Sequence, residues 1–153
     1  PTGCLNRPRS RYDAPMDPHQ HRITVRYGET DQMGFAHHAN YMLYLEEART
    51  ALMAASCMPY GELEARGIGL PVRKANLRYR APARFEDVLA VGVWIGRVGP
   101  ASITFGYQID RPADGVHIAS ATMELASIDL GSGALRALPD DLRASLERTR
   151  AAG

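Results

Sequence analysis

Residues 26–49 of the sequence read RYGETDQMGFAHHANYMLYLEEAR, and this stretch decides the fold. Just upstream, apolar residues alternate with polar ones over residues 21–27, which predicts a half-buried strand. From Asn40 onward the apolar residues recur at helical spacing, which predicts an amphipathic helix that Pro59 and Gly61 end. Either Asn40 caps this helix or its first turn begins at His38. The loop between strand and helix therefore places an acid, a glycine and two adjacent histidines beside the free backbone N–H groups of a helix start.

The rest of the chain has the two-residue period of strands. Long strands rich in β-branched and aromatic residues, separated by turns with glycine or proline, are predicted over residues 70–80, 87–97, 101–110 and 116–129. A short helical turn is expected over residues 60–66, a short strand near Leu135, and a C-terminal helix from Leu138. A long helix followed by an antiparallel meander predicts an α+β fold, with a strongly bent sheet of five or six strands wrapped around the helix.

The composition is typical of one globular domain. The chain has 153 residues, of which 45% are hydrophobic and 23% charged, so one buried core is expected. Residues 1–18 contain four prolines and no period, which predicts a flexible tail, and residues 19–150 are expected to form the single domain. The net charge of +1 argues against nucleic acid as a partner. No apolar run is long enough for a membrane span or resembles a secretory signal, so a cytoplasmic location is expected.

Three motifs in the opening stretch resemble one known family. Tyr27-x-x-Thr-Asp-x-x-Gly34, His38-x-Asn-Tyr41 and Glu46-x-Ala-Arg49 resemble the YbgC and 4-hydroxybenzoyl-CoA thioesterase family of the hotdog fold. Residues 79–87 resemble the segment that enters the second long strand of that family. The resemblance covers residues 20–147 and implies an acyl-CoA thioesterase that releases a free acid and CoA, with a place in lipid or aromatic-acid metabolism.

The resemblance also implies how the site is built. Asp31 falls at the family's catalytic carboxylate, and a carboxylate can either attack the thioester carbonyl or deprotonate a water. Gly34 lets the loop turn tightly and lets the substrate approach the backbone. The backbone N–H of His38 and the adjacent helix start are expected to bind the oxyanion, while the His38 side chain orients a water or the acyl group.

Substrate contacts are expected at two groups of residues. The acyl pocket is predicted to include Tyr27, His37, Asn40 and Tyr41, although a helix cap is favoured for Asn40 and the helix core for Tyr41. The phosphates of CoA are expected to bind the basic run on the strands, because guanidinium groups match phosphate oxygens. The members of that run on which the prediction rests are Arg78, Arg80 and Arg84.

Other polar residues of the stretch are expected to be structural. Glu29 is predicted to be a solvated loop residue, and Glu46 and Arg49 to pair with each other along the helix. The two cysteines and the histidines have no metal-ligand spacing, so neither a metal nor another cofactor is expected. An exposed sheet face implies a second subunit, so we expect a homodimer or a dimer of dimers with the active site between subunits.

Two other functions are compatible with the same fold. A hotdog hydratase or dehydratase needs a histidine and an acid acting across the β-carbon of an acyl chain. A non-catalytic module would bind acyl-CoA or an acyl carrier protein without turnover. A second group of hotdog enzymes uses a helix glutamate as its carboxylate, which makes Glu46 or Glu47 the rival to Asp31.

Overall fold

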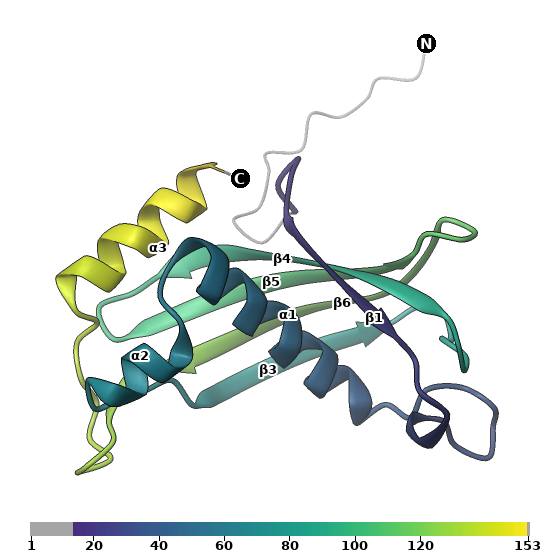
Figure 1. Cartoon of the computed structure of the whole chain (residues 1–153), viewed down its shortest axis with the longest axis horizontal. Coiled ribbons are helices and arrows are strands. Elements are labelled where there is room, and N and C mark those ends of the chain that lie inside the picture. The colour runs from purple at the N-terminus through teal and green to yellow at the C-terminus, as the bar shows by residue number, and fades with distance from the viewer. Residues whose placement is uncertain (1–13, 153) are drawn as a thin grey trace.

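A computed structural model describes residues 14–152, in which one long helix crosses a face of a curved antiparallel sheet (Figure 1). The helices and strands, in chain order, are β1 (His19–Thr24), the 3-10 helix η1 (Tyr27–Glu29), α1 (Asn40–Ser56), α2 (Tyr60–Ala65), β2 (Ile68–Gly69), β3 (Val72–Tyr79), β4 (Val88–Val98), β5 (Ser102–Arg111), β6 (Val116–Ala126), β7 (Ile128–Asp129) and α3 (Asp140–Ala152). The sheet has the strand order β1-β4-β5-β6-β3, and β2 pairs with β7 in a separate ribbon. Most of the predicted tail, residues 1–13, lies outside the described residues.

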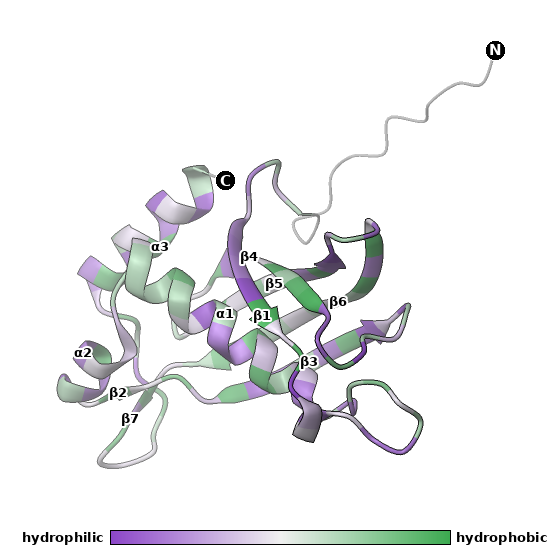
Figure 2. Ribbon diagram, turned by 45° about the vertical axis from the view of Figure 1, so that its right-hand side comes forward, coloured by the Kyte–Doolittle hydropathy of each residue, from purple (hydrophilic) through white to green (hydrophobic). Residues whose placement is uncertain are grey.

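The core lies between α1 and the inner face of the sheet. Every second residue of β5 points inward and is buried, which is the period that predicted a strand. α1 buries the face predicted from its spacing, and hydrophobic and hydrophilic residues alternate along it (Figure 2). The α+β prediction, with a long helix against a five-stranded sheet, is therefore confirmed.

Three predicted strands have different ends in the structure. Pro71 has no N–H for a ladder, so the strand predicted over residues 70–80 begins only at Val72, as β3, and the short β2 before Pro71 was not predicted. The strand predicted over residues 116–129 is divided at Ser127, whose N–H donates to the carbonyl of Ala101 as the chain leaves the main sheet for the ribbon. β1 ends at Thr24, before the predicted Tyr27, and Leu135 forms only an isolated bridge with Ile128.

The outer face of the sheet holds one tight contact. The indole of Trp94 covers Gly106 on the neighbouring strand, and a Cβ at Gly106 would lie 2.3 Å from Cε2 of Trp94. Because real Cβ contacts are never that short, any side chain at Gly106 must displace the indole.

We therefore expect Gly106→Ala to lower the free energy of unfolding by about 1–3 kcal/mol through overpacking. Urea unfolding followed by circular dichroism measures this change. Gly61→Ala is the control, because a Cβ there has no atom within 4 Å and Gly61 lies inside α2, where alanine favours the helix. Equal stability of the Gly106→Ala protein and the parent would contradict the expectation.

Candidate active site

The loop that carries Asp31 is held by its own backbone. The N–H of Asp31 donates to the carbonyl of Phe35 (3.1 Å), and the N–H of Gly34 donates to the carbonyl of Asp31 (2.9 Å). The Asp31 carboxylate accepts the N–H of Met33 through Oδ1 (2.9 Å). Gly34 has φ +81°, a left-handed conformation that favours glycine, as its predicted role in a tight turn requires. The backbone bonds hold the turn of the loop, and the bond from Met33 orients the Asp31 carboxylate.

Asp31 and His38 line one cavity of about 390 Å³. It lies between the loop, the first turn of α1 and the segment that follows β3, and its remaining lining residues are Met33, Phe35, Ala36, Tyr41, Tyr79, Arg80, Ala81 and Pro82. The walls are mostly apolar or aromatic around a few polar groups, as in many small-molecule sites. The predicted residues Asp31, His38, Tyr41 and Arg80 are therefore brought together.

The first turn of α1 has the hydrogen bonds of a 3-10 helix, from each N–H to the carbonyl three positions earlier. The N–H of Asn40 donates to the carbonyl of His37 (3.0 Å), and that of Tyr41 to the carbonyl of His38 (3.3 Å). The N–H of His38 itself donates to no acceptor within residues 14–152. Of the donors expected at the helix start, the His38 N–H is thus without an acceptor in this range, and His38 lines the cavity.

Tyr79 ties the far wall of the cavity to this turn. Its hydroxyl donates to the carbonyl of His38 (3.2 Å), and its ring meets that of Tyr41 edge to face with 5.0 Å between centroids. Tyr79 is the last residue of β3, so it joins the sheet to the start of α1. Sequence reasoning did not single out this tyrosine, because its contact with His38 spans 41 positions.

The other predicted pocket residues lie around the cavity rather than in it. Tyr27 is 78% exposed and packs its ring edge against Phe85. His37 is exposed, and its ring lies 4.0 Å from that of His38. Asn40 does not cap α1: the helix begins at Asn40, and its side-chain amide instead donates to the carbonyl of Glu29 (2.7 Å).

The three arginines predicted to bind CoA are placed differently. Arg80 lines the cavity, and Arg84 donates to the carbonyl of Gly34 in the Asp31 loop (3.3 Å). Arg78 pairs across the sheet with Ser120, and both line a depression on the outer face of the sheet. The structure thus brings two of the three arginines to the Asp31 loop.

Glu29 is buried, so its prediction as a solvated residue is wrong. Only 7% of its surface is exposed. Oε2 accepts the hydroxyl of Tyr44 and the N–H of Arg26, each at 2.8 Å, and Oε1 accepts the Arg26 guanidinium. Burial raises the pKa of Glu29, but these hydrogen bonds outweigh it and hold the pKa below the ordinary value of 4.5. Glu29 is therefore an ionised, buried carboxylate.

This lowered pKa predicts how acid affects stability. A carboxyl with a lower pKa in the folded state stabilises the fold above its unfolded pKa and loses that effect as the pH falls through the folded pKa. We expect the melting temperature of the parent to exceed that of Glu29→Gln at pH 7, and the difference to shrink as the pH falls below 4.5. Calorimetry of both proteins from pH 7 to pH 3 measures it, and a pH-independent difference would contradict the expectation.

Arg49 does not pair with Glu46, contrary to prediction. Arg49 is only 4% exposed, whereas Glu46 lies on the exposed face of α1. The Arg49 guanidinium donates to Sδ of Met123 on β6 (2.8 Å) and lies 5.8 Å from the ring centroid of Tyr60. The spacing of the pair is right for a helix, but the Arg49 side chain is buried against Met123 and Tyr60, whereas Glu46 stays exposed.

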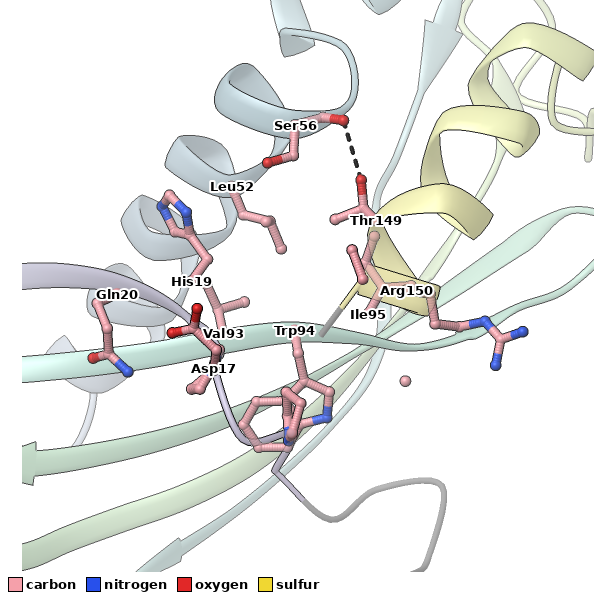
Figure 3. Close-up of a pocket in the computed structure, with 14 residues that line it drawn as sticks. Asp17, His19, Gln20, Leu52, Ser56, Val93, Trp94, Ile95, Thr149 and Arg150 are labelled. Atoms are coloured by element: carbon pink, nitrogen blue, oxygen red, sulfur yellow. Dashed lines mark hydrogen bonds between the residues drawn. The ribbon is translucent and has the colours of Figure 1, made fainter.

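A larger cavity of about 590 Å³ lies at the other end of α1, between α1, α3 and β4 (Figure 3). Leu52 and Trp94 contribute apolar walls, and the hydroxyl of Thr149 donates to the carbonyl of Ser56 at its edge (3.1 Å). It contains none of the predicted site residues.

No three histidine, cysteine or acidic side chains in the described range are arranged to hold a metal ion. No helix of that range is long and apolar enough to cross a membrane.

One known family matches both the fold and the Asp31 loop of this chain. The model of the thioesterase-like superfamily matches residues 25–146, which include the Asp31 loop and the whole sheet except β1. The chain belongs to this superfamily. The predicted family of thioester hydrolases and its hotdog fold are thereby confirmed, whereas the roles of the individual site residues stay predictions.

Individual members of the superfamily align over most of the chain. YneP of Bacillus subtilis is 35% identical over 103 residues, which are 67% of this chain and 75% of YneP. The acyl-CoA thioester hydrolase YbgC of Escherichia coli O6:H1 is 29% identical over 82% of this chain and 93% of its own. The crystal structure of the protein TT1821 from Thermus thermophilus superimposes with a TM-score of 0.80 and 35% identity, covering 85% of this chain and 98% of TT1821.

Proposed function

We propose that this thioesterase-superfamily protein hydrolyses an acyl-CoA thioester to a free acid and CoA, with Asp31 as its catalytic carboxylate. One observation carries the proposal: Asp31 lines the same cavity as His38, whose N–H donates to no acceptor within residues 14–152. Thioester hydrolysis needs a nucleophile for the carbonyl carbon, or a base that activates a water for the same attack, and a donor to the carbonyl oxygen. Asp31 and the His38 N–H would supply these two parts.

Two routes lead from this pair to the products. In the first, an oxygen of Asp31 attacks the thioester carbon, the C–S bond breaks to release CoA thiolate, and water then cleaves the mixed anhydride. In the second, Asp31 removes a proton from a water as that water attacks, and the C–S bond breaks directly. In both, the His38 N–H donates to the carbonyl oxygen as negative charge develops on it.

The activity is tested by thiol release from a panel of acyl-CoA thioesters. The panel contains short and long aliphatic chains and aromatic acyl groups, because Phe35, Tyr41 and Tyr79 offer aromatic walls to either kind. We expect release of free CoA from at least one class, detected with a thiol reagent. Hydration of an enoyl-CoA without thiol release, or tight binding without turnover, would contradict the proposal and select one of the two alternatives.

Arg80 is proposed to bind a phosphate of CoA at the mouth of the cavity. Loss of one charge-assisted hydrogen bond is worth about 1.5–3 kcal/mol, so Arg80→Ala should raise KM about 10-fold or more and leave kcat within about 3-fold. Steady-state kinetics with the best thioester of the panel measure both constants. Arg148→Ala, an exposed arginine on α3, is the control. An unchanged KM in Arg80→Ala would exclude this contact.

A homodimer is proposed from the edge of the sheet. β3 is an outer strand of the five, and seven of its eight residues are exposed. Such a long edge strand has unpaired backbone groups that a second copy can satisfy, and Tyr79 at its end lies in the cavity. Sedimentation equilibrium is expected to give a mass of two or four chains, and a monomer at micromolar concentration would contradict this assembly.

A further inference from the structure

Glu29 joins three parts of the chain that meet behind the Asp31 loop. Its carboxylate accepts the backbone N–H and the guanidinium of Arg26, just after β1, and the hydroxyl of Tyr44 in the second turn of α1. Each oxygen therefore accepts two hydrogen bonds, all between 2.6 and 2.8 Å: Oε1 from the guanidinium, and Oε2 from the backbone N–H and the hydroxyl. A carboxylate held by charged and neutral donors on both oxygens has one favourable orientation.

The backbone of the same residue holds the other end of the loop. The Glu29 carbonyl accepts the N–H of His37 (2.8 Å) and the side-chain amide of Asn40 (2.7 Å). Glu29 stands two positions before Asp31, and His37 stands one position before His38. The bond from His37 to Glu29 thus joins the two ends of the loop from residue 30 to residue 36, next to the bridge between Thr30 and Ala36. Asp31 and His38 each lie within two positions of that bond.

We propose that Glu29 is the positioning residue of the active site, setting the Asp31 carboxylate against the His38 N–H through its bonds to Tyr44 and to the loop base. This inference rests on the proposed function, because it assigns Glu29 to the reaction of Asp31. Glu29 does not line the cavity, so it acts on the substrate only through these two neighbours. Misplacement of a catalytic group by about 1 Å can cost on the order of 100-fold in rate. A residue that holds the loop rigid therefore keeps the reaction rate high.

Two variants weaken the hydrogen bonds at the Glu29 carboxylate and leave no large cavity in its place. Glutamine at position 29 has one oxygen and one NH₂ group, so one group now turns hydrogens toward donors that the carboxylate satisfied. Tyr44→Phe removes only the hydroxyl that donates to Oε2 and keeps the ring in the core. Glu147→Gln is the matched control, because Glu147 also pairs with an arginine three positions away, Arg150, but on the surface of α3.

We expect Glu29→Gln to lower kcat 10- to 100-fold and Tyr44→Phe to lower it 3- to 10-fold, with KM within 3-fold of the parent in both. Glu147→Gln should leave both constants unchanged. Circular dichroism at the assay temperature confirms that each variant is folded, and Tyr44→Phe decides the question if Glu29→Gln does not fold. A folded Tyr44→Phe protein with the parental kcat would overturn the proposal.

The decisive readout is the combination with Asp31→Asn. If Glu29 acts through Asp31, Glu29→Gln should slow the Asp31→Asn protein by less than 3-fold, far less than it slows the parent. A full and independent loss in that background would overturn the positioning role. The single variants separate the two proposals: Asp31→Asn with parental turnover refutes the proposed function, whereas inactive Asp31→Asn with unchanged kcat in Glu29→Gln and Tyr44→Phe refutes only the role of Glu29.

Discussion

Asp31→Asn is expected to lower kcat by about 100-fold to 10,000-fold, because the loss of a positioned base or nucleophile has effects of this size. Asparagine keeps the shape of aspartate and its Oδ1, which still accepts the N–H of Met33. The loop should therefore keep its turn, and the loss of activity should come from the missing charge. Thiol release under single-turnover conditions with the best acyl-CoA of the panel measures the effect.

The two helix glutamates provide the comparison for this experiment. Glu46 lies on the exposed face of α1, and Glu47 accepts Nε2 of His21 on β1 (2.7 Å); neither lines the Asp31 cavity. Glu46→Gln and Glu47→Gln are thus expected to keep kcat within about 3-fold of the parent. Inactivation by either substitution, together with normal turnover in Asp31→Asn, would move the catalytic carboxylate to the helix.

The architecture was predictable because burial follows simple periods along this chain. The inward residues of the strands and the buried face of α1 repeat every second and every third or fourth position, and the structure has the expected helix and meander. The strand ends at Pro71 and Ser127 were missed for different reasons. Pro71 lies beside the apolar residues Leu70 and Val72, which fit a strand, whereas the break at Ser127 depends on the carbonyl of Ala101, 26 positions away in the sequence.

The site was predictable only where it is local. Asp31, Gly34 and His38 lie within eight positions, so a short motif contains them all, and the fold brings Asp31 and His38 to one cavity. Glu29 was misassigned because its burial depends on Tyr44, which is 15 positions away and joins it only after α1 packs on the sheet. Tyr79 was missed for the same reason, since no spacing in the sequence relates the end of β3 to the start of α1. An acid close before a tyrosine-rich helix is a signal for such a buried pair.

Phe105→Ala is expected to lower the free energy of unfolding more than any other substitution proposed above. Phe105 lies in the middle of β5, is fully buried and faces α1, with Ile95 and Met123 as its partners on the neighbouring strands. Removing a buried phenylalanine side chain costs about 3–5 kcal/mol, because apolar contact is lost and a cavity is left. Urea unfolding should show a lower midpoint with a similar slope, as expected when stability changes but the exposed surface does not.

Phe85→Ala separates this packing effect from the loss of a phenyl ring as such. Phe85 is 47% exposed and has an edge-to-face contact with Tyr27, so its removal should cost only about 0.5–1.5 kcal/mol. If the two substitutions lower the free energy of unfolding equally, the inner face of the sheet is not the main apolar core.

Phe105→Ala should also affect activity. Because α1 and β5 share that core, the substitution should make the start of α1 and the adjacent Asp31 loop more mobile. At temperatures well below its unfolding midpoint, the variant should therefore bind acyl-CoA normally but turn it over more slowly, since binding tolerates a mobile loop better than catalysis does.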